Sequence, residues 1–314
     1  MTARLTDWLL ATFVPQHGDI NDPLVRAKYG FLEAWISITG NVGLAAVKIV
    51  LGVTLNSVSL MADAAHTISD VLTSGVVLAS FYISAQEPDR EHPFGHGRVE
   101  FMASLAIAVL LGLIGIEFGR TSSQRLLDGS QVTGSMVAAL IMFLSGLAKE
   151  LMALVSIDLG HRIDSSALLA DAWHHRSDAI ASVLVAVAIV AAYLGYPSLD
   201  AVLGLGVSAL IVYTAWQLGS SATNSLIGEA PDANLVGQII TTANSVPGVL
   251  KAHDLIVHEY GITKAVSLRI VVDGNISLTA AHKIAHQVET KIRTVIVGTA
   301  VVHVDPNGLH KTKT

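Results

Sequence analysis

The hydrophobic positions of this chain gather in long runs, unlike the alternating pattern of a soluble protein. Six segments reach the roughly 20 apolar residues that a helix needs to cross a bilayer. Polar stretches with turn-forming residues, such as QEPDREHPFGHGRVE and GYPSLD, separate them. The predicted spans are residues 31–53, 57–84, 99–119, 134–158, 167–194 and 198–219. The sequence therefore predicts a membrane all-α domain of six transmembrane helices within residues 1–227.

The pattern changes after residue 227. A segment with helical spacing, NLVGQIITTANSV, is followed by two alternating segments, an amphipathic helical segment and a last alternating segment. This order predicts a cytoplasmic α+β domain, αββαβ, over residues 228–314, with its helices on one face of a small sheet.

The composition agrees with a membrane protein. Hydrophobic residues make up 52% of the chain and charged residues 14%, whereas a soluble domain has about 25% charged residues. The chain has no cysteine, which excludes disulfides, thiolate metal sites and iron–sulfur clusters. The net charge of −6 gives no indication of a nucleic-acid partner. The first 22 residues lack a small-residue cleavage site, and we interpret them as a cytoplasmic amphipathic lead-in rather than a signal peptide.

The basic residues of the short loops predict the orientation of the spans. With the N-terminus inside, only Arg120 and Arg125 lie on the outer side. We therefore expect both termini in the cytoplasm. The basic residues of the inner side are then Arg4, Arg26, Lys28, Arg90, Arg98 and Arg162.

The second and fifth predicted spans contain the same polar pattern, A-D-A-x-H-x-x-S-D. It reads ADAAHTISD at residues 62–70 and ADAWHHRSD at residues 170–178. Positions three, four and seven apart share one face of a helix, so each copy forms a polar stripe. Because each ionisable side chain at bilayer depth costs about 2.5–3.5 kcal/mol, we expect the two stripes to face each other. Their members are Asp63, His66, Asp70, Asp171, His174 and Asp178.

Two imidazoles and two carboxylates can surround one point between the stripes. Such an N2O2 set suits a borderline divalent ion such as Zn2+, and the two carboxylates neutralise its charge. Because the ligands must lose protons to bind metal, a protein that moves around this site can exchange metal for H+. The predicted ligands are His66, Asp70, His174 and Asp178.

The remaining polar residues of the two stripes have a second interpretation. Asp63 and Asp171 either belong to the same site or form hydrogen-bonded contacts between helices. His175 and Arg176 point to other faces of the fifth span, and we assign them no ligand role.

With these motifs the chain resembles the cation diffusion facilitator family of divalent-metal transporters. The resemblance covers nearly the whole chain: six spans, HxxxD in the second and the fifth, the loop HPFGHGRVE, and the α+β tail. It implies a homodimeric transporter in the lipid bilayer, not an enzyme, that exports divalent metal from the cytoplasm in exchange for H+. The tail would be a metallochaperone-like domain for regulation and dimerisation.

The family's transport-site positions fall on the four predicted ligands, and the His-Asp-His-Asp set is similar to the zinc-preferring pattern. We therefore expect Zn2+ as the transported ion and H+ as the counter-ion. The chain has no His-rich insertion between the fourth and fifth spans, which favours a bacterial inner membrane over an organelle.

The resemblance also implies a peripheral metal site in the loop between the second and third spans. Asp89, His92 and His96 match a site seen in some members, and three such residues within eight positions can meet in one loop. The alternative is a structural turn in which the histidines and Arg98 connect the membrane and soluble parts.

In the tail, four residues fall where family members bind regulatory metal. Arg269 occupies a position at which some members have another histidine ligand, and a cation there disfavours a full two-metal cluster. The four residues are His253, His282, His303 and Asp305.

Other functions remain open at this point. The chain could handle Fe2+, Mn2+, Cd2+ or Co2+, or be a transport-inactive, metal-sensing partner subunit. A membrane haem protein would favour paired histidines without a carboxylate four residues away. An intramembrane metalloprotease would need a motif such as HExxH, which the sequence does not contain.

Overall fold

The computed structural model describes residues 2–15, 17–54, 58–128, 136–194, 196 and 199–307. The chain forms two compact units. The first consists of Met1–Ala85 and Val99–Thr223, and the second of Gln86–Arg98 and Asn224–Thr314. The loop between the second and third spans thus belongs to the same unit as the C-terminal residues. The domain boundary at residues 227/228 stays a prediction.

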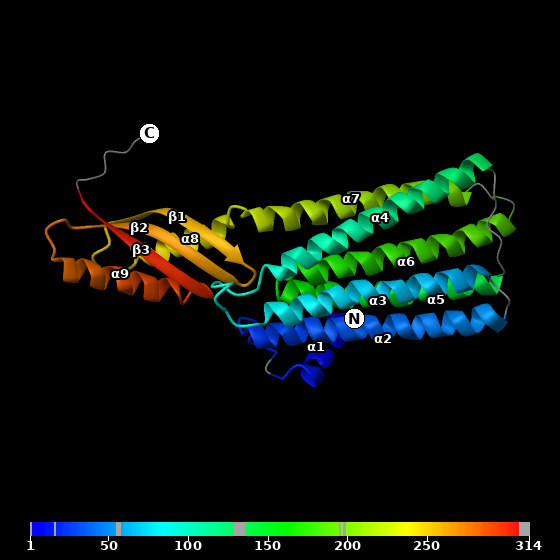
Figure 1. Ribbon diagram of the computed structural model, residues 1–314, viewed down its shortest axis with the longest axis horizontal. Helices are drawn as coiled ribbons and strands as arrows, with labels where there is room; N and C mark the ends of the chain where they lie inside the picture. Colours follow the sequence, from blue (N-terminus) through cyan, green and yellow to red (C-terminus); the bar gives the residue numbers. More distant parts are fainter. Residues whose placement is uncertain are drawn as a thin grey trace. The chain divides into compact units, whose positions relative to one another are not determined.

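The described part of the first unit contains a short helix and six long helices (Figure 1). Each predicted span corresponds to one long helix, so the helical membrane domain is confirmed. Several helices extend beyond the predicted apolar segments; α4, for example, continues to Asp128. The helices are α1 (Thr2–Phe13), α2 (Pro23–Thr54), α3 (Val58–Ser84), α4 (Val99–Asp128), α5 (Met136–Arg162), α6 (Ser166–Tyr193) and α7 (Leu199–Ile227).

Helix length and hydropathy support membrane insertion. Among the described residues, α2, α4, α5 and α6 contain stretches long and apolar enough to cross a membrane, and α3 contributes the shorter apolar stretch Asp70–Ser84. The short helix α1 is amphipathic: Leu10 is fully buried next to α5, whereas Trp8 is exposed.

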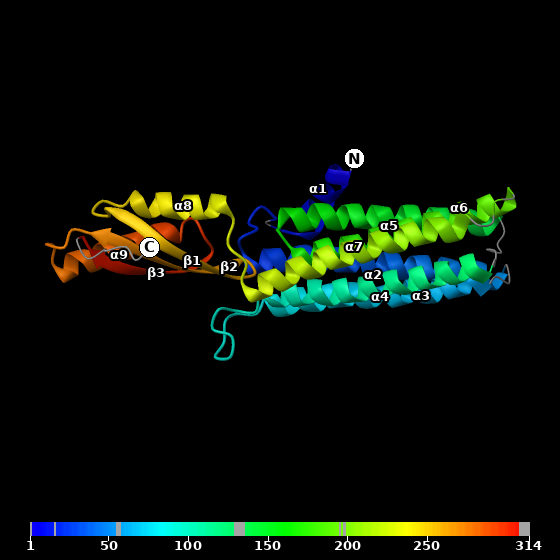
Figure 2. The same ribbon diagram turned by 90° about the horizontal axis from the view of Figure 1, so that it is seen from above.

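The long helices pack in two close pairs. In both views α2 runs along α3, and α5 runs along α6 (Figure 1, Figure 2). A Cβ at Gly30 would overlap the ring of Phe81, so the glycine allows α2 to approach α3 closely. Helix α6 also contacts α3 and α4. This arrangement brings the polar stripe of α6 next to that of α3.

The end of the first unit at which α2 and α6 begin is held together by Arg26. Its guanidinium donates to both carboxylate oxygens of Glu100 in α4, at 3.1 and 2.7 Å. It also donates to the carbonyl oxygens of Ile163 and Asp164 between α5 and α6. Ser165 donates to the Glu100 carboxylate at 3.0 Å. Arg26 and Glu100 are buried, so this network closes the end of the unit.

The second unit contains a three-stranded sheet covered on one face by two helices (Figure 1). Strand β2 is antiparallel to β1 and parallel to β3, giving the order β1-β2-β3. Buried residues alternate along β2 and share one hydrophobic core with both helices. The predicted αββαβ order is confirmed. The elements are α8 (Ala233–Asn244), β1 (Lys251–Tyr260), β2 (Thr263–Val272), α9 (Leu278–Ile292) and β3 (Gly298–Pro306).

Residues 86–98 lie on the turn between β1 and β2. The ring of Phe94 stacks on Tyr260, with centroids 4.7 Å apart. The guanidinium of Arg98 lies 4.2 Å from the centroid of the same ring and donates to the carbonyl oxygen of Glu259 at 3.0 Å. Arg98 therefore contacts the tail, as the structural-turn interpretation of this loop expected.

Candidate metal site

Asp70 of α3 meets His174 and Asp178 of α6 inside the first unit. Nε2 of His174 lies 3.6 Å from Oδ1 of Asp70 and 3.6 Å from Oδ2 of Asp178. The three residues offer ligand atoms that lie within 4.8 Å of one another, close enough to hold one ion. All three side chains are buried. The structure thus brings together three of the four predicted ligands, which we name the transport cluster.

The fourth predicted ligand is His66. Its backbone belongs to α3, but its side chain lies outside the described residues, as does that of Asp63. Sequence spacing places His66 one helical turn before Asp70. Its role as a ligand, like metal binding by the whole set, stays a prediction.

A cation that the sequence analysis missed lies within the transport cluster. The Lys149 ammonium of α5 donates to Oδ2 of Asp70 at 2.7 Å and to Oδ2 of Asp178 at 2.9 Å. Lys149 is buried, so its charge offsets part of the cost of burying two carboxylates. The signal was present in the sequence, because a single lysine inside a predicted span is expensive and must find a partner. A metal ion that binds both carboxylates must compete with this ammonium.

A cavity of about 580 Å³ borders the transport cluster. Its lining includes the two carboxylates and Lys149, and extends to Glu117 and Arg125 in the C-terminal half of α4. Arg26 and Glu100 hold the opposite end of the unit. Among the described residues, the cavity thus extends from the cluster toward one end of the unit, and Arg26 and Glu100 close the other end.

A second buried cluster joins α2 to α6. Glu33, Asp171 and His175 offer ligand atoms within 4.8 Å of one another, and each is at most 1% exposed. Nε2 of His175 lies 3.3 Å from Oδ2 of Asp171. Neither Glu33 nor His175 was predicted as a ligand, because a polar stripe on one helix does not show which residues of a neighbouring helix pack against its other face. We name these three residues the second cluster.

Arg176 behaves as the sequence analysis expected. It forms an ion pair with Glu150 of α5 at 2.7 Å and takes no part in either cluster. Asp171, for which helix contact was the alternative, lies in the second cluster rather than in the transport cluster.

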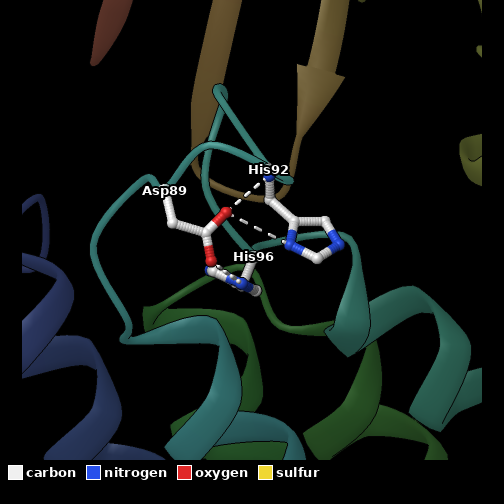
Figure 3. A group of neighbouring side chains, drawn as sticks. All are labelled: Asp89, His92 and His96. Atoms are coloured by element: carbon white, nitrogen blue, oxygen red, sulfur yellow. Dashed lines mark hydrogen bonds and ion pairs between the residues drawn. The ribbon is translucent and has the colours of Figure 1, made fainter.

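Asp89, His92 and His96 meet in the loop of the second unit (Figure 3). Oδ1 of Asp89 lies 3.5 Å from Nδ1 of His92, and Oδ2 lies 3.5 Å from Nε2 of His96. The backbone N–H groups of His92 and Glu91 donate to Asp89, at 2.6 and 2.9 Å, and lower the pKa of its carboxyl group. An ionised carboxylate between two imidazoles fits a divalent cation. Both interpretations of the loop are thus compatible, and its metal binding stays a prediction.

The tail residues do not form a comparable set. Arg269 donates to both oxygens of Asp305, at 2.9 Å each, and this carboxylate raises the pKa of Arg269. His253 and His303 lie 3.8 and 3.3 Å from Asp305. His282 is exposed on α9, which covers the face of the sheet opposite to Arg269 and His303. Asp305 thus lies near His253 and His303 but is also held by Arg269, and His282 lies away from it, so the four predicted tail ligands are not brought together within the described part of one chain.

Two family models match the chain. The cation efflux transmembrane domain matches residues 34–227, and the cytoplasmic domain of cation efflux proteins matches residues 231–307. The chain is 34% identical over 271 residues to an uncharacterized transporter of Methanocaldococcus jannaschii. This alignment covers 86% of this chain and 96% of the relative. It is 32% identical over 260 residues to the magnetosome protein MamB of Magnetospirillum gryphiswaldense, covering 82% and 87% of the two chains. It is 28% identical over 280 residues to the manganese efflux system protein MneS of Bacillus subtilis, covering 89% and 96%.

These matches agree with the helical membrane unit and the small α+β unit found in the structure. They span both units and concern transporters rather than enzymes. The chain belongs to the cation diffusion facilitator family, and it is a multi-pass membrane protein for the efflux of divalent cations.

Proposed function

We propose that the protein exports Zn2+ from the cytoplasm in exchange for H+, with His66, Asp70, His174 and Asp178 as its transport site. The observation that carries this proposal is the buried transport cluster, in which an imidazole and two carboxylates from facing helices converge within 4.8 Å. Ionisable groups are rare at this depth of a membrane protein and mark ion pathways.

The donor set favours Zn2+. Imidazole together with carboxylate suits zinc, whereas sites built from carboxylates, carbonyls and water suit Mn2+. One relative is named as a manganese efflux protein, so Mn2+ is the first alternative cargo, followed by Fe2+, Cd2+ and Co2+. The metal in this proposal is the transported substrate.

Proton exchange follows from the chemistry of the ligands. Metal binding requires a neutral imidazole and ionised carboxylates, so an arriving ion releases protons and departing metal allows protons to return. The Lys149 ammonium adds a third cation to this exchange, because it holds the same carboxylate oxygens at 2.7 and 2.9 Å. Alternating access would consist of opening the Arg26–Glu100 end while the cavity at the other end closes.

Orientation, assembly and location belong to the same proposal. The distribution of basic loop residues supports cytoplasmic termini, and therefore a cavity that extends toward the outer side. A homodimer is supported by the match of the tail to the cytoplasmic-domain model and by exposed Ile256 and Val301 on its sheet. We place the protein in a bacterial inner membrane.

The test is metal uptake into proteoliposomes with an imposed pH gradient, over a panel of divalent ions. Zn2+ should be transported fastest and should move protons the other way. Asp178→Ala should abolish transport, and Asp158→Ala, which removes a half-buried carboxylate at the end of α5, should retain it. Undiminished flux in Asp178→Ala would reject the site, and Zn2+ flux without proton movement would reject the exchange.

A further inference from the structure

The second cluster, Glu33, Asp171 and His175, lies outside the proposed transport site and has the composition of a metal site. We propose that it is a second intramembrane binding site for a divalent cation, which holds the ion before it reaches the transport cluster. The inference relies on the proposed function only for the statement that the bound ion is cargo. The existence of the site is tested separately from transport.

Unpartnered ligand atoms point to a bound cation. Among the described residues, no hydrogen-bond partner is found for Oε2 of Glu33, Oδ1 of Asp171 or Nδ1 of His175, and Oδ2 of Asp171 has an ion-pair contact with Nε2 of His175 at 3.3 Å. These three side chains are at most 1% exposed, so bulk water cannot hydrogen-bond to these atoms. Two buried carboxylates also repel each other, which adds to the cost of desolvation. A divalent cation would offset both costs.

Two serines orient the Glu33 carboxylate. Ser37 and Ser156 both donate to its Oε1 atom, at 3.0 and 2.6 Å, and leave Oε2 free. The Ser37 hydroxyl also lies 2.7 Å from Nε2 of His175. Hydrogen bonds of this kind, from residues behind the ligands, are what fixes carboxylates and imidazoles at metal sites.

Charge distinguishes this cluster from the transport cluster. Lys149 partly neutralises Asp70 and Asp178, whereas no ion pair with a lysine or arginine is found for Glu33 or Asp171 among the described residues. The two carboxylates therefore match the charge of a divalent ion. One imidazole and two carboxylates suit Zn2+, Co2+ and Mn2+.

The position of the second cluster fits a station on the way to the transport cluster. Ser156, which touches Glu33, follows Lys149 by seven residues in α5, so the second cluster is about 10 Å closer to the end held by Arg26. His174 and His175 are neighbours in α6, with ring centroids 6.0 Å apart. Ions this close repel each other strongly, so the two clusters would be occupied in turn.

The experiment measures Co2+ binding to the purified full chain. Its background variant is D70N/D178N/H92A, which removes the transport cluster and the loop site. Co2+ content per chain and its visible absorption spectrum are compared before and after adding Glu33→Gln. The matched control is Glu150→Gln, which removes the same charge from α5 outside both clusters.

The background variant and the control should each bind one Co2+ per chain in the membrane unit, and Glu33→Gln should lose it. Ser156→Ala, which keeps all three ligands, should weaken binding about 10- to 100-fold. It serves as the second variant if Glu33→Gln fails to fold. Absence of Co2+ binding in the background, or equal binding with and without Glu33, would overturn the inference.

Transport separates this inference from the proposed function. In otherwise unchanged protein, Glu33→Gln should raise the KM for metal supplied from the side of the chain termini. If the unaltered protein transports no metal but the background variant still binds Co2+ through Glu33, the proposed function fails and the second site stands. An unchanged KM in Glu33→Gln would refute the role of the site as a station for cargo.

Discussion

The Lys149 ammonium is predicted to compete with the transported ion, and Lys149→Met removes this competition. The ammonium donates two short hydrogen bonds to the carboxylates of Asp70 and Asp178, at 2.7 and 2.9 Å, at a buried position. A hydrogen bond to a charged group contributes about 1.5–3 kcal/mol, so metal entry must replace roughly 3–6 kcal/mol of interaction. The displaced ammonium would recover part of this interaction energy by hydration in the neighbouring cavity, which Lys149 lines.

A net competition of about 2 kcal/mol corresponds to a factor of about 30 in the dissociation constant, since 1.4 kcal/mol is tenfold. Lys149→Met should therefore bind Zn2+ about 30-fold more tightly at neutral pH. Without metal the same variant should be less stable by about 3–5 kcal/mol, because a buried charge has lost its partner. Zinc should restore much of that stability.

The gain in zinc affinity of Lys149→Met should depend on pH. In the unaltered protein, Zn2+ displaces the ammonium from the carboxylates. In Lys149→Met a proton takes the place of that cation, so metal binding should release up to one additional proton. The gain in affinity should therefore shrink as the pH falls.

Isothermal titration calorimetry of detergent-purified protein at several pH values measures both the dissociation constant for Zn2+ and the number of protons released. The matched control is Arg176→Met, which removes a cation that joins α5 to α6 outside the cluster. An unchanged dissociation constant together with an unchanged proton release in Lys149→Met would refute the reasoning. Equal shifts in both variants would show that helix pairing, and not competition at the carboxylates, is responsible.

Two further predictions concern the second unit. Backbone N–H donors lower the pKa of Asp89, so its stabilising contribution is present above the ordinary value of about 3.9 and is lost as the pH falls through the lowered value. The protection factors for amide exchange in the loop should accordingly be steady from about pH 5 to 8 in the unaltered protein and lower in Asp89→Ala at each pH, whereas loss of protection near neutral pH would contradict this. Arg269→His should release Asp305 and add a fourth donor, so zinc analysis of the full chain should find additional metal per chain, and an unchanged zinc content would count against the idea that Arg269 blocks the tail site.

The transport cluster was largely predictable because its signal is local. His174 and Asp178 lie four residues apart on one helix, and an expensive pair of charges at bilayer depth requires a partner. The repeat in α3 supplied that partner, Asp70, without knowledge of the helix arrangement. The order of elements in the tail was equally local, since alternation and helical spacing distinguish strands from helices.

Lys149 and Glu33 were missed for a different reason. Neither residue is repeated in a second span, and neither belongs to a recognisable spacing. Lys149 reaches the two carboxylates only because α5 packs along α6, and Glu33 meets Asp171 and His175 only because α2 approaches α6. The sequence indicates that such charges need partners, but not which ones.

The amino-acid sequence by itself determined the membrane class, the six long helices, the αββαβ tail and the His–Asp pairs, because hydropathy and helical spacing act within a single segment. Only the tertiary structure decided which charges meet: the ammonium between two carboxylates, the second buried cluster, the closed end at Arg26 and the arginine that holds Asp305. Those contacts join residues from different elements, and their distances depend on how helices and strands pack against one another. No spacing along one segment determines that packing.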